Sequence, residues 1–403
     1  MSSCTYLLEA LRAGAHDQAL SALYALDGAQ ASVDRARGRA CHVVQSLMDA
    51  FSPTGDAALF SGPGRTEIGG NHTDHQRGRV LCGSVDMDML ACAAPNGTNI
   101  VRVQSEGYPA LEIGLEDLSV REGEGNTSAA LVRGVAAKVR ELGYPLSGFD
   151  AYITSTVLSG SGLSSSAAYE TLLGNIFNRF CCGGALDAIT IAKIGQYAEN
   201  VYFGKPCGLM DQMGSSVGGA VFIDFNDPGN PVVEKVDYDF SQSGHALCIV
   251  DTASSHGDLT DDYAAVPALR QECGDRAVLR AMHFYSDDRR AAQEAGALKK
   301  GDFEAFLNMV NASGLSSSLC LQNTWSIHDP RQQAIPLALT VGEYLLDGMG
   351  AIRVHGGGFA GTIQAWVPEE YLTVFKNGIE GLFGPGKCHV LHIRPQGGCV
   401  VAE

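Results

Sequence analysis

Features that would identify a membrane, secreted or zinc-binding protein are missing from this 403-residue sequence. No apolar run approaches the roughly 18 residues that a transmembrane helix needs. The first residues, MSSCTYLLEALRAGAH, lack the basic start and the long apolar core of a signal peptide. The twelve cysteines include no Cys-x-x-Cys pair, and the adjacent Cys181 and Cys182 do not have a zinc spacing. We therefore expect a cytoplasmic protein with free thiols and no membrane partner.

Positive charge is also scarce, because 28 Lys and Arg stand against 45 Asp and Glu and leave a formal net charge of −17. A surface this acidic argues against nucleic acid as a partner. It leaves open a neutral small molecule, or an anion held in a local basic pocket. The P-loop pattern Gly-x4-Gly-Lys-Ser/Thr is absent as well, so any nucleotide must be bound in another way.

Helix-like and strand-like segments alternate in both halves of the chain, which predicts two α+β domains. We place an N-terminal helical extension at residues 1–34, an N-terminal domain at 35–225 and a C-terminal domain at 226–403. The segment 59–80 is rich in glycine and charge but shows no regular hydrophobic period. It is therefore predicted to be mostly loop.

The pentapeptide GLSSS occurs twice. In GSGLSSSAAYE, residues 160–170, it lies on a Gly-rich turn between a predicted strand and a predicted helix. Such a turn directs backbone N–H groups and the positive end of the helix dipole at one point, which suits a phosphate. The alternative is a flexible loop whose serines cap the helix. The second copy, in NASGLSSSLCL at 311–321, follows a helical run and is predicted to stop one helix and cap the next.

A second candidate is PGRTEIGGNHTDH, residues 63–75, which gathers an arginine, a glutamate, two histidines and an aspartate among glycines. The alternative is a solvated loop, since loops often carry such charge. Metal binding by His72, Asp74 and His75 is a rival interpretation, but the sequence offers no second cluster to complete a metal shell.

Two further segments carry candidate chemistry. In AENVYFGKPCGLMDQMGSS, residues 198–216, the carboxylates of Glu199 and Asp211 are twelve positions apart. One could hold magnesium while the other accepts a proton, although such loose spacing is common by chance. The glycines of RVHGGGFAG, residues 353–361, indicate either a tight turn or a close approach of the backbone to a ligand or another segment.

Taken together and in this order, the four motifs resemble those of the GHMP kinase superfamily and of its galactokinase family. The resemblance runs from about residue 35 to 400. It implies a two-domain α+β GHMP-kinase fold with the active site in the interdomain cleft. It also implies an ATP-dependent kinase that phosphorylates the C1 hydroxyl of a sugar, with Mg²⁺ as cofactor and with galactose 1-phosphate and ADP as products.

The resemblance assigns roles to single positions. Asp211 would accept or orient the proton of the C1 hydroxyl, and Arg65 would stabilise the transferring phosphoryl group. Mg²⁺ would be held by Ser166 and Glu199. The ATP phosphates would lie on Gly160, Ser161, Gly162, Leu163, Ser164, Ser165 and Ser166. The sugar would contact Asn71, His72, Asp74, Gly208 and Tyr263.

One departure from the family concerns the substrate. Galactokinases usually have Gly-Glu-His-Thr-Asp, whose glutamate contacts the C6 hydroxyl of the sugar, whereas this chain has Asn71 in its place. Asparagine can still bond a C6 hydroxyl. It also removes a charge that would repel a C6 carboxylate by about 4 kcal/mol across about 4 Å at an effective dielectric near 20. We expect galactose as the substrate, with galacturonate or another galactose derivative as the alternative.

A third possibility is a non-catalytic sugar sensor that acts in transcriptional control. The acidic charge argues against it, as does the joint presence of Arg65, Ser166, Glu199 and Asp211. We expect a monomer whose partners are a small sugar and ATP.

Overall fold

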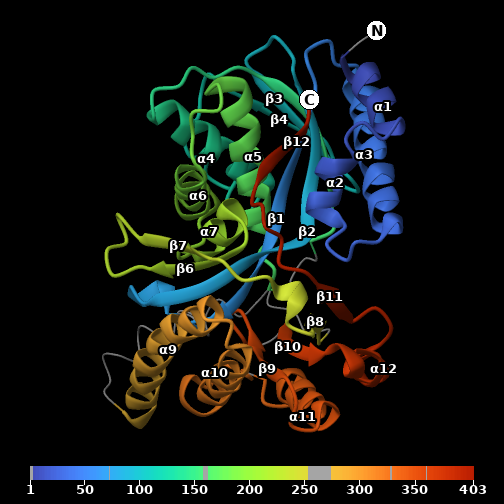
Figure 1. The fold of residues 1–403 in the computed structure, drawn as a ribbon. Coiled ribbons are helices and arrows are strands. Elements are labelled where there is room, and N and C mark those ends of the chain that lie inside the picture. Colours follow the sequence, from blue (N-terminus) through green and yellow to red (C-terminus); the bar gives the residue numbers. More distant parts are fainter. Residues whose placement is uncertain (1–2, 72, 158–161, 253–273, 327–328, 360) are drawn as a thin grey trace.

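The computed structural model describes residues 3–71, 73–157, 162–252, 274–326, 329–359 and 361–403. Several predicted site residues lie outside these ranges: His72, Gly160, Ser161 and Tyr263. Figure 1 shows two parts, an upper one built on a large sheet and a lower one built on a smaller sheet. The predicted α+β class is therefore confirmed.

The larger sheet has eight strands, in the order β12-β1-β2-β5-β3-β4, with β6 and β7 branching from β2. Their bounds are β1 Ala58–Gly69, β2 Arg79–Pro95, β3 Ile100–Ser105, β4 Leu111–Gly114, β5 Phe149–Ser155, β6 Ala220–Asp224, β7 Val232–Val236 and β12 Cys399–Ala402. The pairs are antiparallel except for β3 with β5, which is parallel. The last strand of the chain thus lies beside the first.

Strand β1 corrects one prediction, because the segment from residue 59 to 69 is a buried strand and not a loop. Every residue of β1 is buried, so its sequence has no reason to alternate between apolar and polar side chains. Its glycines allow close packing: a Cβ at Gly62 would lie 2.3 Å from the carbonyl oxygen of Ala168. Missing periodicity therefore reflected burial on both faces and not exposure to solvent.

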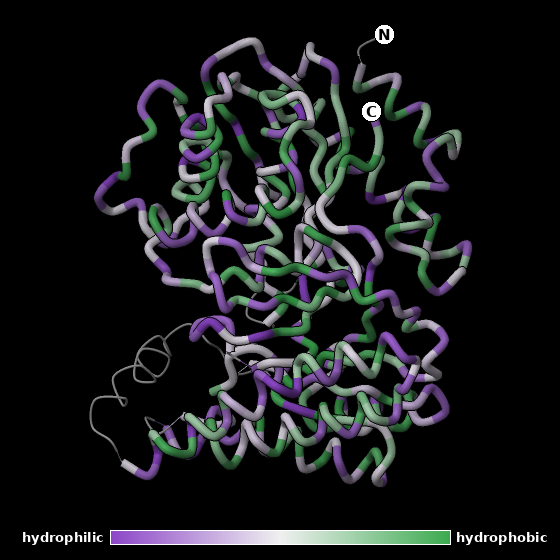
Figure 2. The backbone as a smooth tube through the Cα atoms, turned by 60° about the vertical axis from the view of Figure 1, so that its left-hand side comes forward, coloured by the Kyte–Doolittle hydropathy of each residue, from purple (hydrophilic) through white to green (hydrophobic). Residues whose placement is uncertain are grey.

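Helices cover both faces of the larger sheet, as the apolar interior in Figure 2 also indicates. On one face lie α4 Ser128–Glu141, α5 Ser165–Cys181, α6 Ala188–Tyr197 and α7 Met210–Val217. On the other lie α1 Ser3–Arg12, α2 Asp17–Tyr24 and α3 Gln30–Phe51. Alternate residues of β1 serve the two cores: Phe60 packs with α5, and Leu59 packs with the N-terminal helices.

A buried ion cluster joins the N-terminal helices to the sheet. Asp88 of β2 is fully buried and accepts hydrogen bonds from Arg39 at 2.5 Å, from Tyr24 at 2.5 Å and from Ser61. Arg394, also fully buried, lies 3.5 Å from the same carboxylate. Because α3 crosses the predicted boundary at residue 34 and supplies Arg39, the N-terminal helices are packed into the upper part of the molecule.

The smaller sheet has the order β11-β8-β10-β9, and all its pairs are antiparallel. Its strands are β8 His245–Asp251, β9 Ala351–His355, β10 Thr362–Pro368 and β11 Cys388–Leu391. Its helices are α9 Asp275–Lys299, α10 Phe303–Ser316, α11 Ala334–Leu346 and α12 Leu372–Phe383. Helices α11 and α12 pack on one face, and α9 and α10 pack on the face that also meets Ile68 and Leu81 of the larger sheet. The two parts of the molecule therefore share a hydrophobic core.

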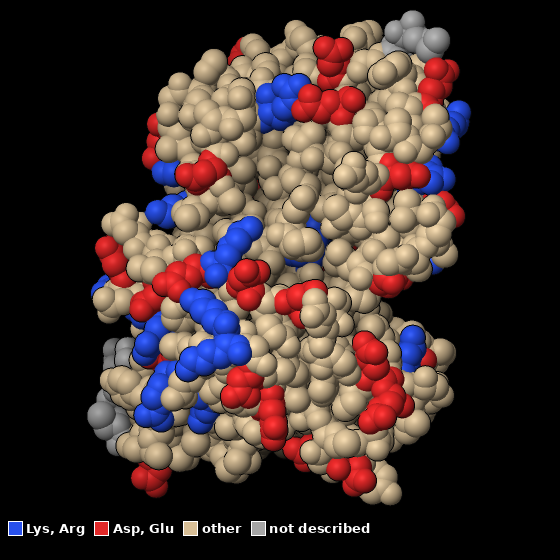
Figure 3. Space-filling view, in the orientation of Figure 1, with Lys and Arg blue, Asp and Glu red and all other residues tan. Residues whose placement is uncertain are grey.

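The predicted domain boundary at residue 226 stays a prediction, but β7 and β12 fall after it and lie in the larger sheet. Among the described residues, no helix has the length and apolar character to cross a membrane. On the face shown in Figure 3, basic side chains gather near β7 and α9, intermixed with acidic ones. There Lys299 pairs with Glu234 at 2.7 Å and Arg79 pairs with Asp288.

Candidate active site

The predicted catalytic pair is in direct contact. Asp211 lies in the first turn of α7 and accepts hydrogen bonds on Oδ1 from Arg65 Nε at 2.8 Å and Nη2 at 2.6 Å. Ser164 donates to its other oxygen, Oδ2, at 2.6 Å. Burial by itself would raise the pKa of Asp211, but Arg65, the Ser164 hydroxyl and Lys205 outweigh it and lower the pKa to about 2. Asp211 is therefore ionised at neutral pH.

The described part of the predicted phosphate loop runs from Gly162 into the start of α5 at Ser165. Gly162 and Ser164 both have positive φ, +71° and +57°, which a tight turn before a helix requires. The carbonyl of Leu163 accepts from the Arg65 backbone N–H at 3.0 Å, and the carbonyl of Gly162 accepts from the Arg65 guanidinium. The loop is thus bonded to the strand that carries Arg65, the predicted catalytic arginine.

The predicted magnesium ligands also meet. Ser166 Oγ donates to Glu199 Oε1 at 2.9 Å, and Glu199 lies in a π-helical turn, Ala198–Phe203, at the end of α6. Lys205 Nζ lies 3.3 Å from the same carboxylate oxygen. A hydroxyl and a carboxylate side by side are the hard oxygen donors that Mg²⁺ prefers. The residues present therefore fit the predicted ion.

Sequence reasoning missed a buried carboxylate beside Glu199. Glu170 of α5 is fully buried, and one side-chain nitrogen, Gln212 Nε2, donates to Glu170 Oε2 at 3.0 Å and to Glu199 Oε2 at 2.8 Å. Burial and the nearby charge of Glu199 raise the pKa of Glu170 well above its ordinary value. Glu170 is the last residue of the motif GSGLSSSAAYE. No local sequence pattern indicates that its side chain lies beside Glu199.

The predicted sugar residues Asp74 and Gly208 pack directly against each other. Asp74 begins the short helix Asp74–Gln76, and its side chain is 4% exposed. A Cβ at Gly208 would lie 2.0 Å from Asp74 Oδ2, so the position leaves no room for a side chain. Oδ1 of Asp74 is buried and has no hydrogen-bond partner among the described residues. A buried carboxylate oxygen in this state is ready to accept a bond from a ligand.

Asn71 is predicted to contact the sugar in place of a glutamate. Its side chain is fully buried, and both Nδ2 and Oδ1 are hydrogen-bonded to protein groups. Its Nδ2 donates to Glu67 at 2.8 Å and to the Gly356 carbonyl at 2.7 Å. Its Oδ1 accepts from Asn323 at 2.9 Å and from Ser317 at 3.2 Å. In this arrangement the amide has no donor left for a sugar, so its predicted sugar contact stays a prediction that the geometry does not favour.

The glycines of RVHGGGFAG lie close to the predicted phosphate loop and to Asn323. A Cβ at Gly162 in the phosphate loop would lie 2.9 Å from His355 Nδ1 and 2.9 Å from Thr362 Oγ1. A Cβ at Gly358 would lie 2.1 Å from the Asn323 carbonyl oxygen. The sequence left open a tight turn and a close approach, and the structure shows both: Gly356 has a φ of +65° in a turn, and Gly358 lies against Asn323.

The second GLSSS corrects another prediction. Its glycine and serines do not stop a helix, because α10 continues through Ser316 and passes directly into the π-helical turn Ser317–Leu321. Ser316 bonds to His283 Nδ1 at 2.9 Å, and Ser317 reaches Asn71. The segment therefore contacts Asn71, one of the predicted sugar residues, from the lower part of the molecule.

Comparison with known proteins finds the same segments. Residues 48–95 match the galactokinase galactose-binding signature, and residues 130–219 match the N-terminal domain of the GHMP kinases. A galactokinase of Streptomyces coelicolor is 29% identical over 354 residues, which cover 81% of this chain and 88% of that protein.

Solved structures show the same fold. Lactococcus lactis galactokinase, crystallised with galactose, superimposes with a TM-score of 0.74 at 20% identity, over 88% of this chain and 98% of that one. Methanococcus jannaschii mevalonate kinase superimposes with a TM-score of 0.65 at 16% identity, over 85% and 99%.

The fold and these matches define a GHMP kinase, an ATP-binding phosphotransferase. Within that superfamily the matches are to galactokinases, and the protein is a galactokinase-like sugar kinase. The predicted family, fold and enzyme class are confirmed.

Proposed function

We propose that the protein transfers the γ-phosphoryl group of ATP to the C1 hydroxyl of galactose and forms galactose 1-phosphate and ADP. The observation that carries this proposal is the buried carboxylate of Asp211, which Arg65 and Ser164 hold beside the predicted phosphate loop. The galactose-binding signature at residues 48–95 supports galactose as the sugar.

In the proposed step the C1 oxygen attacks the γ-phosphorus, and the bond from that phosphorus to the β–γ bridging oxygen breaks. The electron pair of the broken bond leaves with ADP, and the proton of the hydroxyl passes to Asp211. A pKa of about 2 makes Asp211 a weak base, which suits a group that orients the hydroxyl and takes the proton late. Phosphoryl transfer needs positioning and charge neutralisation more than an early proton transfer.

Positive charge for the transferring group comes from Arg65, whose guanidinium also contacts the Gly162 carbonyl at the phosphate loop. Ser166 and Glu199 would hold Mg²⁺, which supplies charge neutralisation on the phosphates when it is bound. Mg²⁺ sites of kinases use one or two protein carboxylates and complete their shell with phosphate and water. Among the described residues, no group of three His, Cys, Asp or Glu side chains could hold a metal ion.

The test is sugar-dependent release of ADP in a coupled assay, with galactose and galacturonate in parallel, and phosphorus NMR of the product. We expect turnover of galactose and a phosphate on its C1 oxygen. Turnover of galacturonate well above that of galactose would reject galactose as the substrate. If neither sugar stimulates ADP release, the proposed function is wrong.

A further inference from the structure

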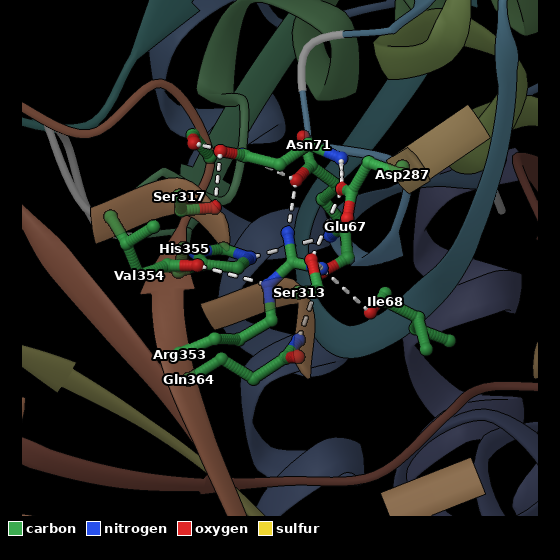
Figure 4. Close-up of polar contacts among 12 residues, drawn as sticks. Glu67, Ile68, Asn71, Asp287, Ser313, Ser317, Arg353, Val354, His355 and Gln364 are labelled. Carbon is green, nitrogen blue, oxygen red and sulfur yellow. Dashed lines mark hydrogen bonds and ion pairs between the residues drawn. The ribbon is translucent and has the colours of Figure 1, made fainter. Parts of the chain in front are cut away.

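The negative charge that is missing at residue 71 is present four residues earlier. Asn71 Nδ2 donates to Glu67 Oε1 at 2.8 Å, and Arg353 of β9 donates to the same oxygen. Figure 4 shows Arg353 reaching from the lower part of the molecule toward Glu67 and Asn71. The carboxylate is therefore held rigidly by two groups that lie on different segments of the chain.

The other oxygen of Glu67, Oε2, is buried and has no hydrogen-bond partner among the described residues. Asp74 Oδ1, on the sugar loop, is in the same condition, with His75 Nε2 at 3.9 Å from it. Leaving a charged oxygen buried and unbonded is costly. Each of these oxygens can accept a hydrogen bond from a donor, and sugar hydroxyls are such donors.

Glu67 faces the same side of β1 as the catalytic arginine. The pairing of β1 with β2 runs without interruption from Arg65 to Glu67, and residues two apart in a strand point to the same face. Arg65 contacts Asp211 on that face. Burial raises the pKa of Glu67 to about 7, against the pull of Arg353, and the charge of Asp74 contributes to the rise.

We propose that Glu67 determines the choice of sugar: its free oxygen accepts a hydrogen bond from a hydroxyl of a neutral sugar and repels an anionic one. The proposal rests on the proposed function and deepens it. Asn71 is then a positioning residue, which holds Glu67 and the sugar loop in place. Loss of the usual glutamate at residue 71 therefore does not open the site to galacturonate.

Arg353 does not offset this selection, because its guanidinium is fully buried and already bonded to protein. Besides Glu67, it donates to the carbonyls of Ile68 at 3.1 Å and Val354 at 3.0 Å, and to Ser313 at 3.3 Å. These hydrogen bonds connect the lower part of the molecule to β1. The guanidinium is therefore not available to bind a sugar carboxylate.

The test compares kcat/KM for galactose and galacturonate at pH 8, where a carboxyl with a pKa of about 7 is mostly ionised. In Glu67→Gln the amide can still accept from Asn71 and Arg353, but a donor replaces the free oxygen. We expect the galacturonate-to-galactose ratio of kcat/KM to rise at least tenfold, through the KM of the sugar, with the KM of ATP unchanged.

Glu294→Gln is the matched control. Glu294 of α9 is another fully buried carboxyl at this interface, and burial raises its pKa well above the ordinary value. Its replacement should leave the sugar ratio unchanged.

Glu67→Asp keeps the charge and should keep the preference for galactose over galacturonate. It provides a second measurement if Glu67→Gln does not fold. Wild-type turnover of galactose with an unchanged ratio in Glu67→Gln would overturn this inference alone. So would a tenfold gain in galacturonate use by Glu67→Asp. Absence of wild-type turnover with either sugar would instead contradict the proposed function.

Discussion

The two copies of GLSSS have the same five residues and different structures. In the first copy, Gly162 and Ser164 have positive φ and the helix begins after the turn, so that Ser164 and Ser166 direct their hydroxyls at Asp211 and Glu199. In the second copy all three serines continue a helix, and Ser316 and Ser317 have φ of −64° and −61°. The local sequence permits both conformations.

The difference comes from what precedes and what packs against each copy. The first follows strand β5, and its glycine lies against His355 and Thr362 of the lower sheet. The second continues α10, and its glycine, Gly314, lets the helix approach β9, since a Cβ there would lie 2.9 Å from the Ile352 carbonyl oxygen. One copy contacts the carboxylates of Asp211 and Glu199, and the other donates a hydrogen bond to Asn71. This comparison can be tested from either side.

The largest effect is expected at the carboxylate that the first copy contacts. Asp211→Asn removes the group that orients the hydroxyl and pairs with Arg65, so kcat should fall by at least about 10²-fold. Steady-state kinetics with galactose and ATP measure this, with circular dichroism to show that the variant is folded. Full activity in the folded variant would contradict the assigned role.

The next effect separates the two copies directly. Ser166→Ala removes the hydroxyl that bonds Glu199 in the proposed magnesium site, and we expect a loss of about 10²-fold in kcat/KM for ATP. A change in the Mg²⁺ concentration needed for half-maximal ATP binding, measured by calorimetry, is the second readout. Ser318→Ala, at the half-buried last serine of the second copy, is the control and should behave like the wild type. Equal losses in both variants would mean that the second copy is also a phosphate loop.

A smaller effect is expected at Ser317 of the second copy and should show whether this serine stabilises Asn71 or acts on the nucleotide. Ser317→Ala removes a hydrogen bond to Asn71 Oδ1, so the free energy of unfolding should fall by about 1 kcal/mol. The KM for galactose should rise a few-fold, and the KM for ATP should not change. Urea unfolding and steady-state kinetics provide the two measurements, again with Ser318→Ala as control. A change confined to the KM for ATP would show that this serine acts on the nucleotide instead.

The smallest effect concerns the stability of the interface that the second copy supports. The pKa of Glu67 is raised to about 7, so the folded protein binds its proton more tightly than the unfolded chain does. This contribution is complete below the ordinary carboxyl pKa and is lost as the pH rises toward and through 7. The charged groups that face Glu67 are Arg65, Asp74 and Arg353, and Glu294 lies nearby.

Glu67→Gln should therefore gain stability relative to the wild type between pH 5 and pH 8. Unfolding in urea at the two pH values measures the gain. A difference between the two proteins that stays constant across this range would show that Glu67 has an ordinary pKa in the folded state.

Much of the candidate site could be predicted from short motifs. The contact of Asp211 with Arg65 and that of Glu199 with Ser166 join residues that the sequence had singled out, although their catalytic and metal-binding roles remain proposals. The helix from 165 and the strand from 149 were recognisable, because turn glycines and hydrophobic periods are local properties. Strand β1 was missed for the same reason, since a strand buried on both faces has no alternating pattern.

The amino-acid sequence by itself determined the order of the motifs, the family and the residue types that can carry phosphoryl transfer. Only the tertiary structure decided which carboxylate faces which partner. Glu67 and Arg353 are 286 positions apart, and Asn71 and Ser317 are 246 apart, so no local pattern links them. Burial and distant neighbours set the charge of a carboxyl group, and both exist only after the two sheets have packed together.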